Sequence, residues 1–204
     1  MKLIIFDFDG TIADSTHLTF QIYEKLSESF GLKAFTETEI IELKALTMHE
    51  RLKKHQISIF QVPRLARKTR KIVSELMTEI KPFDGMKDVM ETLTHKGYEI
   101  GIVSSNSKKN ITKFLNHYGF PHPKLIYGKA SFFGKRKHLK RMHRKLKSND
   151  TYYVGDEIRD ILACESIEIK MIAVTWGFDD EALLKETNPS YIARKPEEII
   201  KIVG

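Results

Sequence analysis

Two carboxylates follow the first apolar segment of the chain. Residues 3–8 are expected to form a buried strand, and Asp7 and Asp9 occur at its end, separated by one phenylalanine. Residues two apart on a strand share a face, and open α/β sheets bind their ligands at the carboxyl ends of strands. We therefore expect Asp7 and Asp9 to point the same way. Two such charges repel each other unless a cation lies between them or they share a proton.

An Asp-Gly hairpin turn is the alternative interpretation of the same residues. Helical spacing follows from Ile12 to Ser29, however, and no partner strand is recognisable in that stretch. The sequence therefore favours a ligand site over a hairpin.

A second polar segment follows the expected strand Tyr98–Val103. It contains Ser104, Ser105 and Asn106, and a helical pattern comes next. Hydroxyl groups and free N–H groups at a helix N-terminus can bind an anion. The same residue types alone are more typical of a helix cap, but their place at a strand end favours the anion site.

A third group of acids follows the expected strand Thr151–Val154. Gly155 permits a tight turn, and Asp156 and Asp160 lie one helical turn apart, so that both carboxylates can face one pocket. Glu157 lies between them. Acids also stabilise a helix N-terminus in general, but that interpretation leaves the glycine and the strand end unexplained.

The elements that would position these side chains alternate between short apolar runs and helical patterns. Such alternation is typical of a parallel sheet covered on both faces, so we predict an α/β fold with a Rossmann-like parallel sheet. The expected strands are Leu3–Phe8, Tyr98–Val103, Lys124–Tyr127, Thr151–Val154, Lys170–Thr175 and Tyr191–Ala193.

The stretch between the first two strands is far longer than an ordinary crossover. Apolar residues recur there at helical spacing, as at Leu18, Ile22 and Leu26. We predict a helical insertion at residues 15–80 and a catalytic core formed by residues 1–14 and 81–204. The expected hinges lie at residues 14–15 and 81–85, where Pro82 and Gly85 interrupt helix.

Composition narrows the functional classes. The 204 residues carry a net charge of +7, which favours anionic partners. The densest basic run, residues 135–147, reads as an amphipathic helix, and nucleic acid is not expected to be its partner because no binding motif accompanies it. No apolar run approaches the roughly 20 residues of a membrane span, and the single cysteine, Cys164, is expected in the core of a cytoplasmic protein.

The segment Asp7-Phe8-Asp9-Gly10-Thr11-Ile12 resembles the first motif of the haloacid dehalogenase-like hydrolases. The resemblance continues at Ser104, at Gly134-Lys135 and at Gly155-Asp156, in the order of that family. It implies an aspartyl-phosphate mechanism, with Asp7 as nucleophile and Asp9 as general acid and base. The helical insertion is similar to a type-one cap.

The resemblance also implies the remaining roles. Ser104, Ser105 and Asn106 would bind phosphate together with Lys135, whose rival is Lys137 because the family's usual proline after this lysine is missing. Mg²⁺ would be held by Asp7, the main-chain carbonyl of Asp9, and Asp156, with Asp160 and Glu157 beside them. The segments 174–178 and 188–191 resemble the phosphoglycolate phosphatase-like branch, which implies hydrolysis of a small phosphorylated metabolite.

Three alternatives stay open at this point. A sugar phosphomutase would use the same residues, a receiver domain would collect similar acids without catalysis, and a nucleic-acid partner could use the basic helix. Asp9 argues against the dehalogenase branch, which lacks an acid there. Substrate and oligomeric state cannot be read from the sequence, although residues near one turn of the insertion are candidates for selecting the substrate: Lys44, Thr47, His49 and Arg51.

Overall fold

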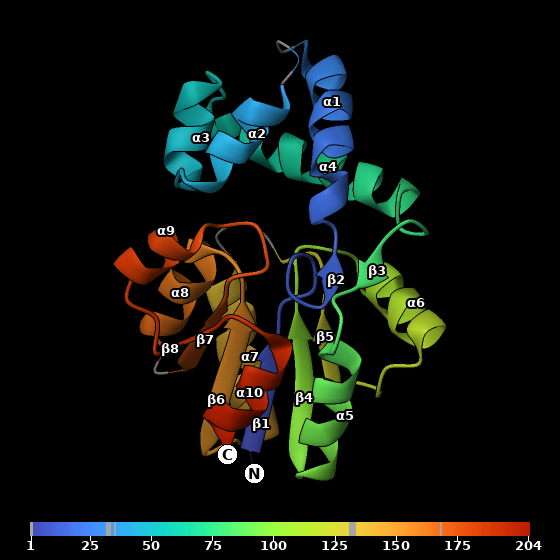
Figure 1. The fold of residues 1–204 in the computed structure, drawn as a ribbon, viewed down its shortest axis with the longest axis vertical. Coiled ribbons are helices and arrows are strands. Elements are labelled where there is room, and N and C mark those ends of the chain that lie inside the picture. Colours follow the sequence, from blue (N-terminus) through green and yellow to red (C-terminus); the bar gives the residue numbers. More distant parts are fainter. Residues whose placement is uncertain (1, 32–33, 35, 131–133, 168) are drawn as a thin grey trace.

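Six short apolar segments form one parallel sheet (Figure 1). The computed structural model describes residues 2–31, 34, 36–130, 134–167 and 169–204. The strand order is β5-β4-β1-β6-β7-β8, with every neighbouring pair parallel. The strands are β1 (Lys2–Phe6), β4 (Tyr98–Val103), β5 (Leu125–Tyr127), β6 (Asp150–Gly155), β7 (Lys170–Val174) and β8 (Tyr191–Ala193). The predicted α/β fold is confirmed.

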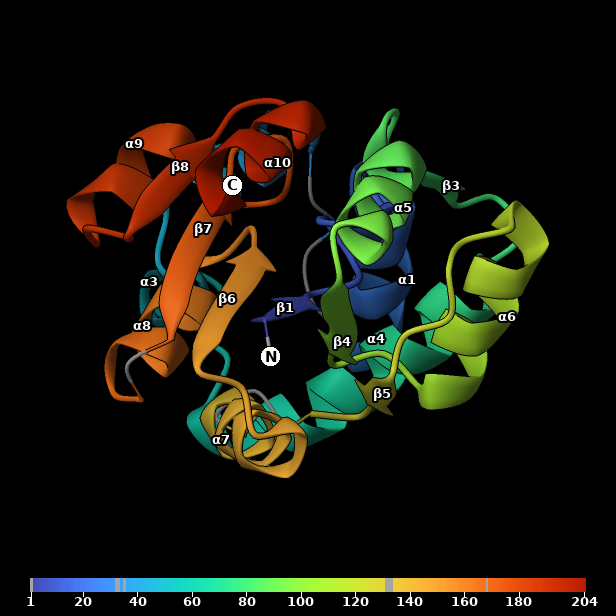
Figure 2. The ribbon, with the colours of Figure 1, turned by 90° about the horizontal axis from the view of Figure 1, so that it is seen from below.

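The central strand β1 is buried on both faces because helices cover both sides of the sheet. Ile4 and Phe6 belong to one apolar cluster, and Leu3 and Ile5 belong to the other. Figure 2 shows α5 and α10 on one side of the sheet and α7 on the opposite side. The helices of the core are α5 (Met86–His95), α6 (Lys108–Tyr118), α7 (Lys135–Leu146), α8 (Ile158–Glu165), α9 (Glu181–Glu186) and α10 (Pro196–Val203).

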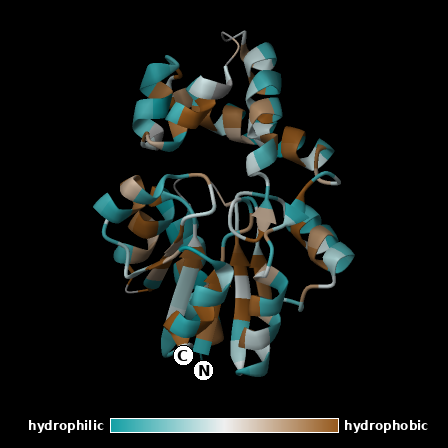
Figure 3. Ribbon diagram, viewed as in Figure 1, coloured by the Kyte–Doolittle hydropathy of each residue, from teal (hydrophilic) through white to brown (hydrophobic). Residues whose placement is uncertain are grey.

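Residues 16–75, which lie between β1 and β4 in the chain, form helices beyond the carboxyl ends of the strands (Figure 1). Apolar stretches, brown in Figure 3, recur along these helices. Leu18, Leu26 and Ile72 are buried there. The elements are the short helix η1 (Thr16–Leu18), α1 (Thr19–Phe30), α2 (Glu37–Lys44), α3 (Met48–Lys54), the short helix η2 (Ile59–Gln61) and α4 (Val62–Glu75).

The two segments that connect this layer to the sheet pair with each other. β2 (Ala13–Asp14) and β3 (Lys81–Pro82) form an antiparallel ladder. β1 pairs with β4 and β6 and not with β2, in agreement with the expectation that no hairpin follows the first strand. Helical structure also starts later than Ile12, at η1 and then at Thr19. The paired residues lie 67 and 69 positions apart in the chain, which no local pattern can reveal.

Two further predictions concern side chains of the core. α7 is amphipathic, with Leu139 and Met142 buried and most of its basic residues exposed. Cys164 is buried in the cluster that contains Leu3. Within the described ranges, the helices are too short or too polar to cross a bilayer.

Candidate active site

Asp7 lies immediately beyond β1 and is buried. Its backbone N–H donates to the carbonyl of Val154 at 2.8 Å, which continues the pairing with β6 by one residue. One carboxylate oxygen accepts the N–H of Phe8 at 2.7 Å, and the other accepts the ammonium group of Lys135. The carboxylate is therefore held in one orientation, as a nucleophile requires.

Lys135, the first residue of α7, is buried between two acids. Its Nζ contacts Asp7 and lies 2.5 Å from Oδ1 of Asp160. Burial acts to lower the pKa of Lys135, but the charges of Asp160 and Asp7 outweigh it and raise the pKa above its ordinary value. The rival Lys137 is exposed on the same helix. Phe132 and Phe133, which precede this lysine, lie outside the described residues.

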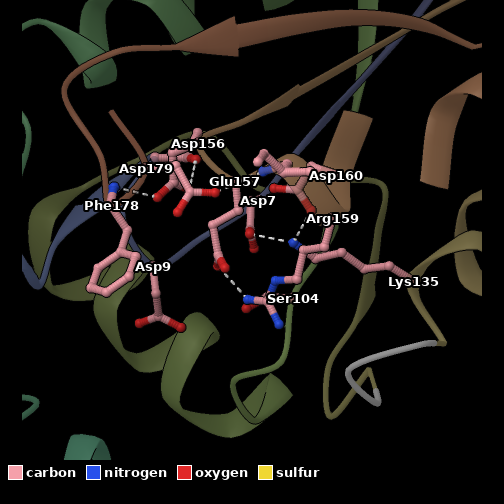
Figure 4. Close-up of polar contacts among 12 residues, drawn as sticks. Asp7, Asp9, Ser104, Lys135, Asp156, Glu157, Arg159, Asp160, Phe178 and Asp179 are labelled. Atoms are coloured by element: carbon pink, nitrogen blue, oxygen red, sulfur yellow. Dashed lines mark hydrogen bonds and ion pairs between the residues drawn. The ribbon is translucent and has the colours of Figure 1, made fainter. Parts of the chain in front are cut away.

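Asp156 and Asp160 follow β6 and are completely buried. Together with Asp7 they form a group in which one carboxylate oxygen of each residue lies within 4.8 Å of the others. Burial and neighbouring carboxylates raise the pKa of Asp156, and burial raises that of Asp160 to about 7 although Lys135 opposes the shift. Figure 4 shows the group with Lys135 beside it.

Glycines let the backbone approach Asp156. Gly10 has a φ of +77°, and a Cβ there would lie 2.2 Å from Oδ2 of Asp156. A Cβ on Gly177 would lie 2.2 Å from the Cβ of the same residue. The Asp156 carboxylate also accepts the hydroxyl of Thr11 at 2.9 Å and the N–H of Phe178 at 2.8 Å.

Asp9 is half-buried and differs from Asp7 in its surroundings. Its carboxylate lies apart from the three clustered acids (Figure 4) and accepts the side-chain amide of Asn106 at 3.1 and 3.2 Å. β1 ends at Phe6 and Asp9 lies in the turn that follows, so strand spacing does not set its direction, and a common direction of Asp7 and Asp9 stays a prediction. Burial, with the charge of Asp7, raises the pKa of Asp9 to about 7.

The segment after β4 lies against this site. The buried Ser104 hydroxyl accepts the N–H of Asn106 at 3.0 Å. Ser107 caps α6 by accepting the N–H of Asn110 at 3.1 Å, so part of the polar run has the capping role. Ser105 lies beside Asp9 and Asn106 in the wall of one cavity. Phosphate binding by Ser104, Ser105 and Asn106 stays a prediction.

The clustered acids fit a divalent cation. The three buried carboxylates lie together, and Lys135 pairs with two of them, Asp7 and Asp160. Oδ2 of Asp160 is buried with no hydrogen-bond partner among the described residues. Burial, together with the charges of Glu157, Asp7 and Asp160, raises the pKa of Asp156, and a bound cation would compensate this negative charge. The main-chain carbonyl of Asp9 stays the predicted fourth ligand.

Sequence reasoning missed several residues around the acids. Arg159 pairs with Glu157. Burial acts to raise the pKa of Glu157, but the positive charges of Arg159, Lys135 and Arg51 outweigh it and lower the pKa. Asp179 accepts the N–H of Ile158 at 2.8 Å, at the start of α8. Segment 174–178 was identified only through its resemblance to the phosphoglycolate phosphatase-like branch. Asp179 follows this segment and belongs to no motif that the sequence analysis recognised.

The four residues considered for substrate selection have different places. Arg51 is buried and pairs with Asp179, and Lys44 reaches the carbonyl of Gly177 at 3.5 Å. Thr47 caps α3 by accepting the N–H of Glu50 at 3.4 Å. His49 is exposed. Of these residues, Arg51 alone lines the cavity above Asp9.

Comparison with known proteins supports this interpretation. The chain is 28% identical over 206 residues to phosphoglycolate phosphatase of Synechococcus elongatus, covering 100% of this chain and 97% of the relative. It is 24% identical over 222 residues to pyrophosphatase PpaX of Oceanobacillus iheyensis, covering 100% and 97%. A crystal structure described as a predicted phosphatase from Clostridium acetobutylicum shares the fold with a TM-score of 0.82 and 19% identity, covering 99% and 97%.

The family comparison is broader. The profile described as haloacid dehalogenase-like hydrolase matches residues 4–174, a range that includes the clustered acids, Asp9, Ser104 and Lys135. This match favours a hydrolase over the receiver-domain alternative. The chain therefore belongs to the haloacid dehalogenase-like hydrolase family, as the sequence motifs predicted.

Proposed function

We propose that the protein is a Mg²⁺-dependent phosphatase that hydrolyses a small phosphomonoester through a phosphorylated Asp7. The observation that carries the proposal is the buried group of Asp7, Asp156 and Asp160 at the carboxyl ends of β1 and β6, in which Lys135 pairs with Asp7 and Asp160. The relatives that are named phosphoglycolate phosphatase and pyrophosphatase support the same type of chemistry.

In the first half-reaction, a carboxylate oxygen of Asp7 attacks phosphorus. The bond between Asp7 and phosphorus forms as the ester P–O bond breaks, and Asp9 donates its proton to the leaving oxygen. A pKa of about 7 allows Asp9 to hold this proton at neutral pH. Asn106 keeps the Asp9 side chain in place through its amide group.

In the second half-reaction, water attacks phosphorus and the bond to Asp7 breaks. Asp9 takes a proton from the water, and phosphate leaves. Lys135 supplies positive charge beside the reacting group in both steps. Asp7, Asp156 and the main-chain carbonyl of Asp9 would hold Mg²⁺, with Asp160 beside them. When bound, the ion would neutralise negative charge on the phosphoryl group.

Residues 15–80 would form the cap domain over a core of residues 1–14 and 81–204. The proposed catalytic side chains all lie outside this cap, while its helices lie above them (Figure 1). The cap would exclude water and select the substrate. The paired segments β2 and β3 would be its connection to the core.

Hydrolysis of para-nitrophenyl phosphate tests the proposal. We expect turnover with Mg²⁺, loss of turnover in excess chelator, and recovery on adding Mg²⁺ back. Ca²⁺ should support turnover poorly because it prefers more ligands and longer bonds. Undiminished turnover in chelator would refute the metal requirement, and no turnover with any phosphate ester would refute the phosphatase.

A further inference from the structure

A cavity of about 290 Å³ lies between the inserted helices and the proposed catalytic residues. At one end it reaches Asp9, Ser105 and Asn106, where the phosphate group would bind. An apolar cavity of about 150 Å³ accommodates a benzene ring. This cavity therefore has room for a substrate part much larger than the two-carbon acid of phosphoglycolate.

The accessible wall of the cavity is mainly apolar. Ile22 and Leu26 of α1 form one side of it, and Leu65 and Val73 of α4 form another, while Phe178 lies on the core side. An anionic substrate part that entered this space would lose hydration without a matching set of donors. An apolar part would instead gain free energy from burial.

Two of the charged groups in the wall already have partners. Arg51 is paired with Asp179, and its Nε also donates to the carbonyl of Leu43 at 2.7 Å. Arg159 is paired with Glu157. These guanidinium groups are therefore committed to protein acids and offer little to a second anionic group on the substrate.

Arg70 of α4 is the remaining arginine in the wall, and it is half-buried. The methylene stem of an arginine adds apolar surface while its charged end reaches towards water. If Arg70 instead received a substrate carboxylate, phosphoglycolate would be favoured. The experiment must separate these two roles.

We propose that the substrate is the phosphate monoester of an apolar alcohol or phenol, with the apolar part bound between α1 and α4. This inference rests on the phosphatase activity proposed above. It distinguishes the protein from its relatives named for phosphoglycolate and pyrophosphate, whose named substrates have no apolar group of this size.

The test compares kcat/KM for ethyl, butyl and hexyl phosphate, 2-phosphoglycolate and pyrophosphate. Burial can contribute about fourfold per methylene, so we expect hexyl phosphate to exceed ethyl phosphate at least ~10-fold, most of it through KM. The kcat/KM values for phosphoglycolate and pyrophosphate should be at least ~10-fold lower than the value for hexyl phosphate.

Two results would overturn the inference while leaving the phosphatase activity intact. One is a kcat/KM that does not change along the alkyl series, and the other is phosphoglycolate or pyrophosphate as the best substrate. No hydrolysis of any ester, para-nitrophenyl phosphate included, would instead refute the phosphatase.

Variants of α4 test where the apolar part of the substrate binds. Ala66 lines the cavity, whereas Arg67 is exposed next to it. Ala66→Phe should reduce the ratio of hexyl to ethyl phosphate at least ~5-fold, whereas Arg67→Phe should keep the wild-type ratio. Equal ratios in both variants would place the apolar group elsewhere. Arg70→Gln should not change the ranking, and a selective loss of phosphoglycolate turnover in that variant would assign Arg70 to a carboxylate.

Discussion

Arg51 of α3 and Asp179, which lies just before α9, form a buried ion pair that connects the inserted helices to the core. The guanidinium group also lies over the ring of Phe178, 4.5 Å from its centroid. Phe178 in turn donates its N–H to Asp156. One series of contacts thus joins the proposed cap to a proposed metal ligand.

Breaking this pair should destabilise the protein strongly. Arg51→Met leaves the buried Asp179 without its cation, and we expect the free energy of unfolding in urea to fall by about 3 kcal/mol. Arg51→Met combined with Asp179→Leu should lose clearly less than the sum of the single variants. Additive losses would show that the two side chains do not stabilise each other.

Lys135 and Lys137 form a matched pair for testing the phosphate lysine. Lys135→Met should lower kcat for para-nitrophenyl phosphate by about 10²-fold or more, as for removal of one group that stabilises a developing charge. Lys137→Met should stay within about twofold of the wild type because its side chain is exposed. Circular dichroism checks that both variants fold, and equal activities in the two folded variants would remove Lys135 from the proposed machinery.

The loss in the rate of phosphoenzyme formation caused by Asp9→Asn should depend on the leaving group of the substrate. A nitrophenolate needs little protonation to depart, whereas an alkoxide needs a proton from Asp9. Phosphoenzyme formation, measured by rapid quench, should therefore fall less for the aryl ester than for an alkyl ester. Equal losses on both classes would assign Asp9 a structural or metal-site role.

The stability of the metal-free protein should depend on pH through Asp9. Its pKa is about 7 in the folded protein, against an ordinary value of 3.8, so the folded state binds the proton more tightly. Stability from this group is present at pH 4 and is lost as pH rises towards 7. We compare the free energies of unfolding of Asp9→Asn and the wild type in urea titrations with chelator. The value for Asp9→Asn minus the value for the wild type should be larger at pH 8 than at pH 4. Asp84→Asn, at an exposed site, supplies the baseline, and an Asp9→Asn difference that does not change with pH would contradict the shift.

The sequence was informative where local pattern determines structure. Continuous apolar runs predicted the strands of the sheet because parallel strands are buried on both faces. The family motifs implied that Asp7, Asp156 and Lys135 belong to one site. Their contacts now show how they meet.

Features that depend on distant pairing could not be predicted in this way. The pairing of β2 with β3 and the contact of Arg51 with Asp179 each join residues that are far apart in the chain. Asp9 lies beyond the end of β1, in a turn that is held by hydrogen bonds between Phe8 and Ala13, so strand periodicity does not determine its position. The cavity above it results from the packing of several helices, which the apolar spacing of one helix does not specify.

Identification of the phosphorylated residue tests the central claim most directly. Asp9→Asn should slow water attack, so rapid quench with ³²P-labelled aryl phosphate, followed by peptide mapping, should find acid-stable, base-labile label on Asp7. The Asp7→Asn protein should fold, lose at least ~10³-fold in turnover and show no label. Label on another residue, or a tenth or more of wild-type turnover in Asp7→Asn, would contradict Asp7 as the nucleophile.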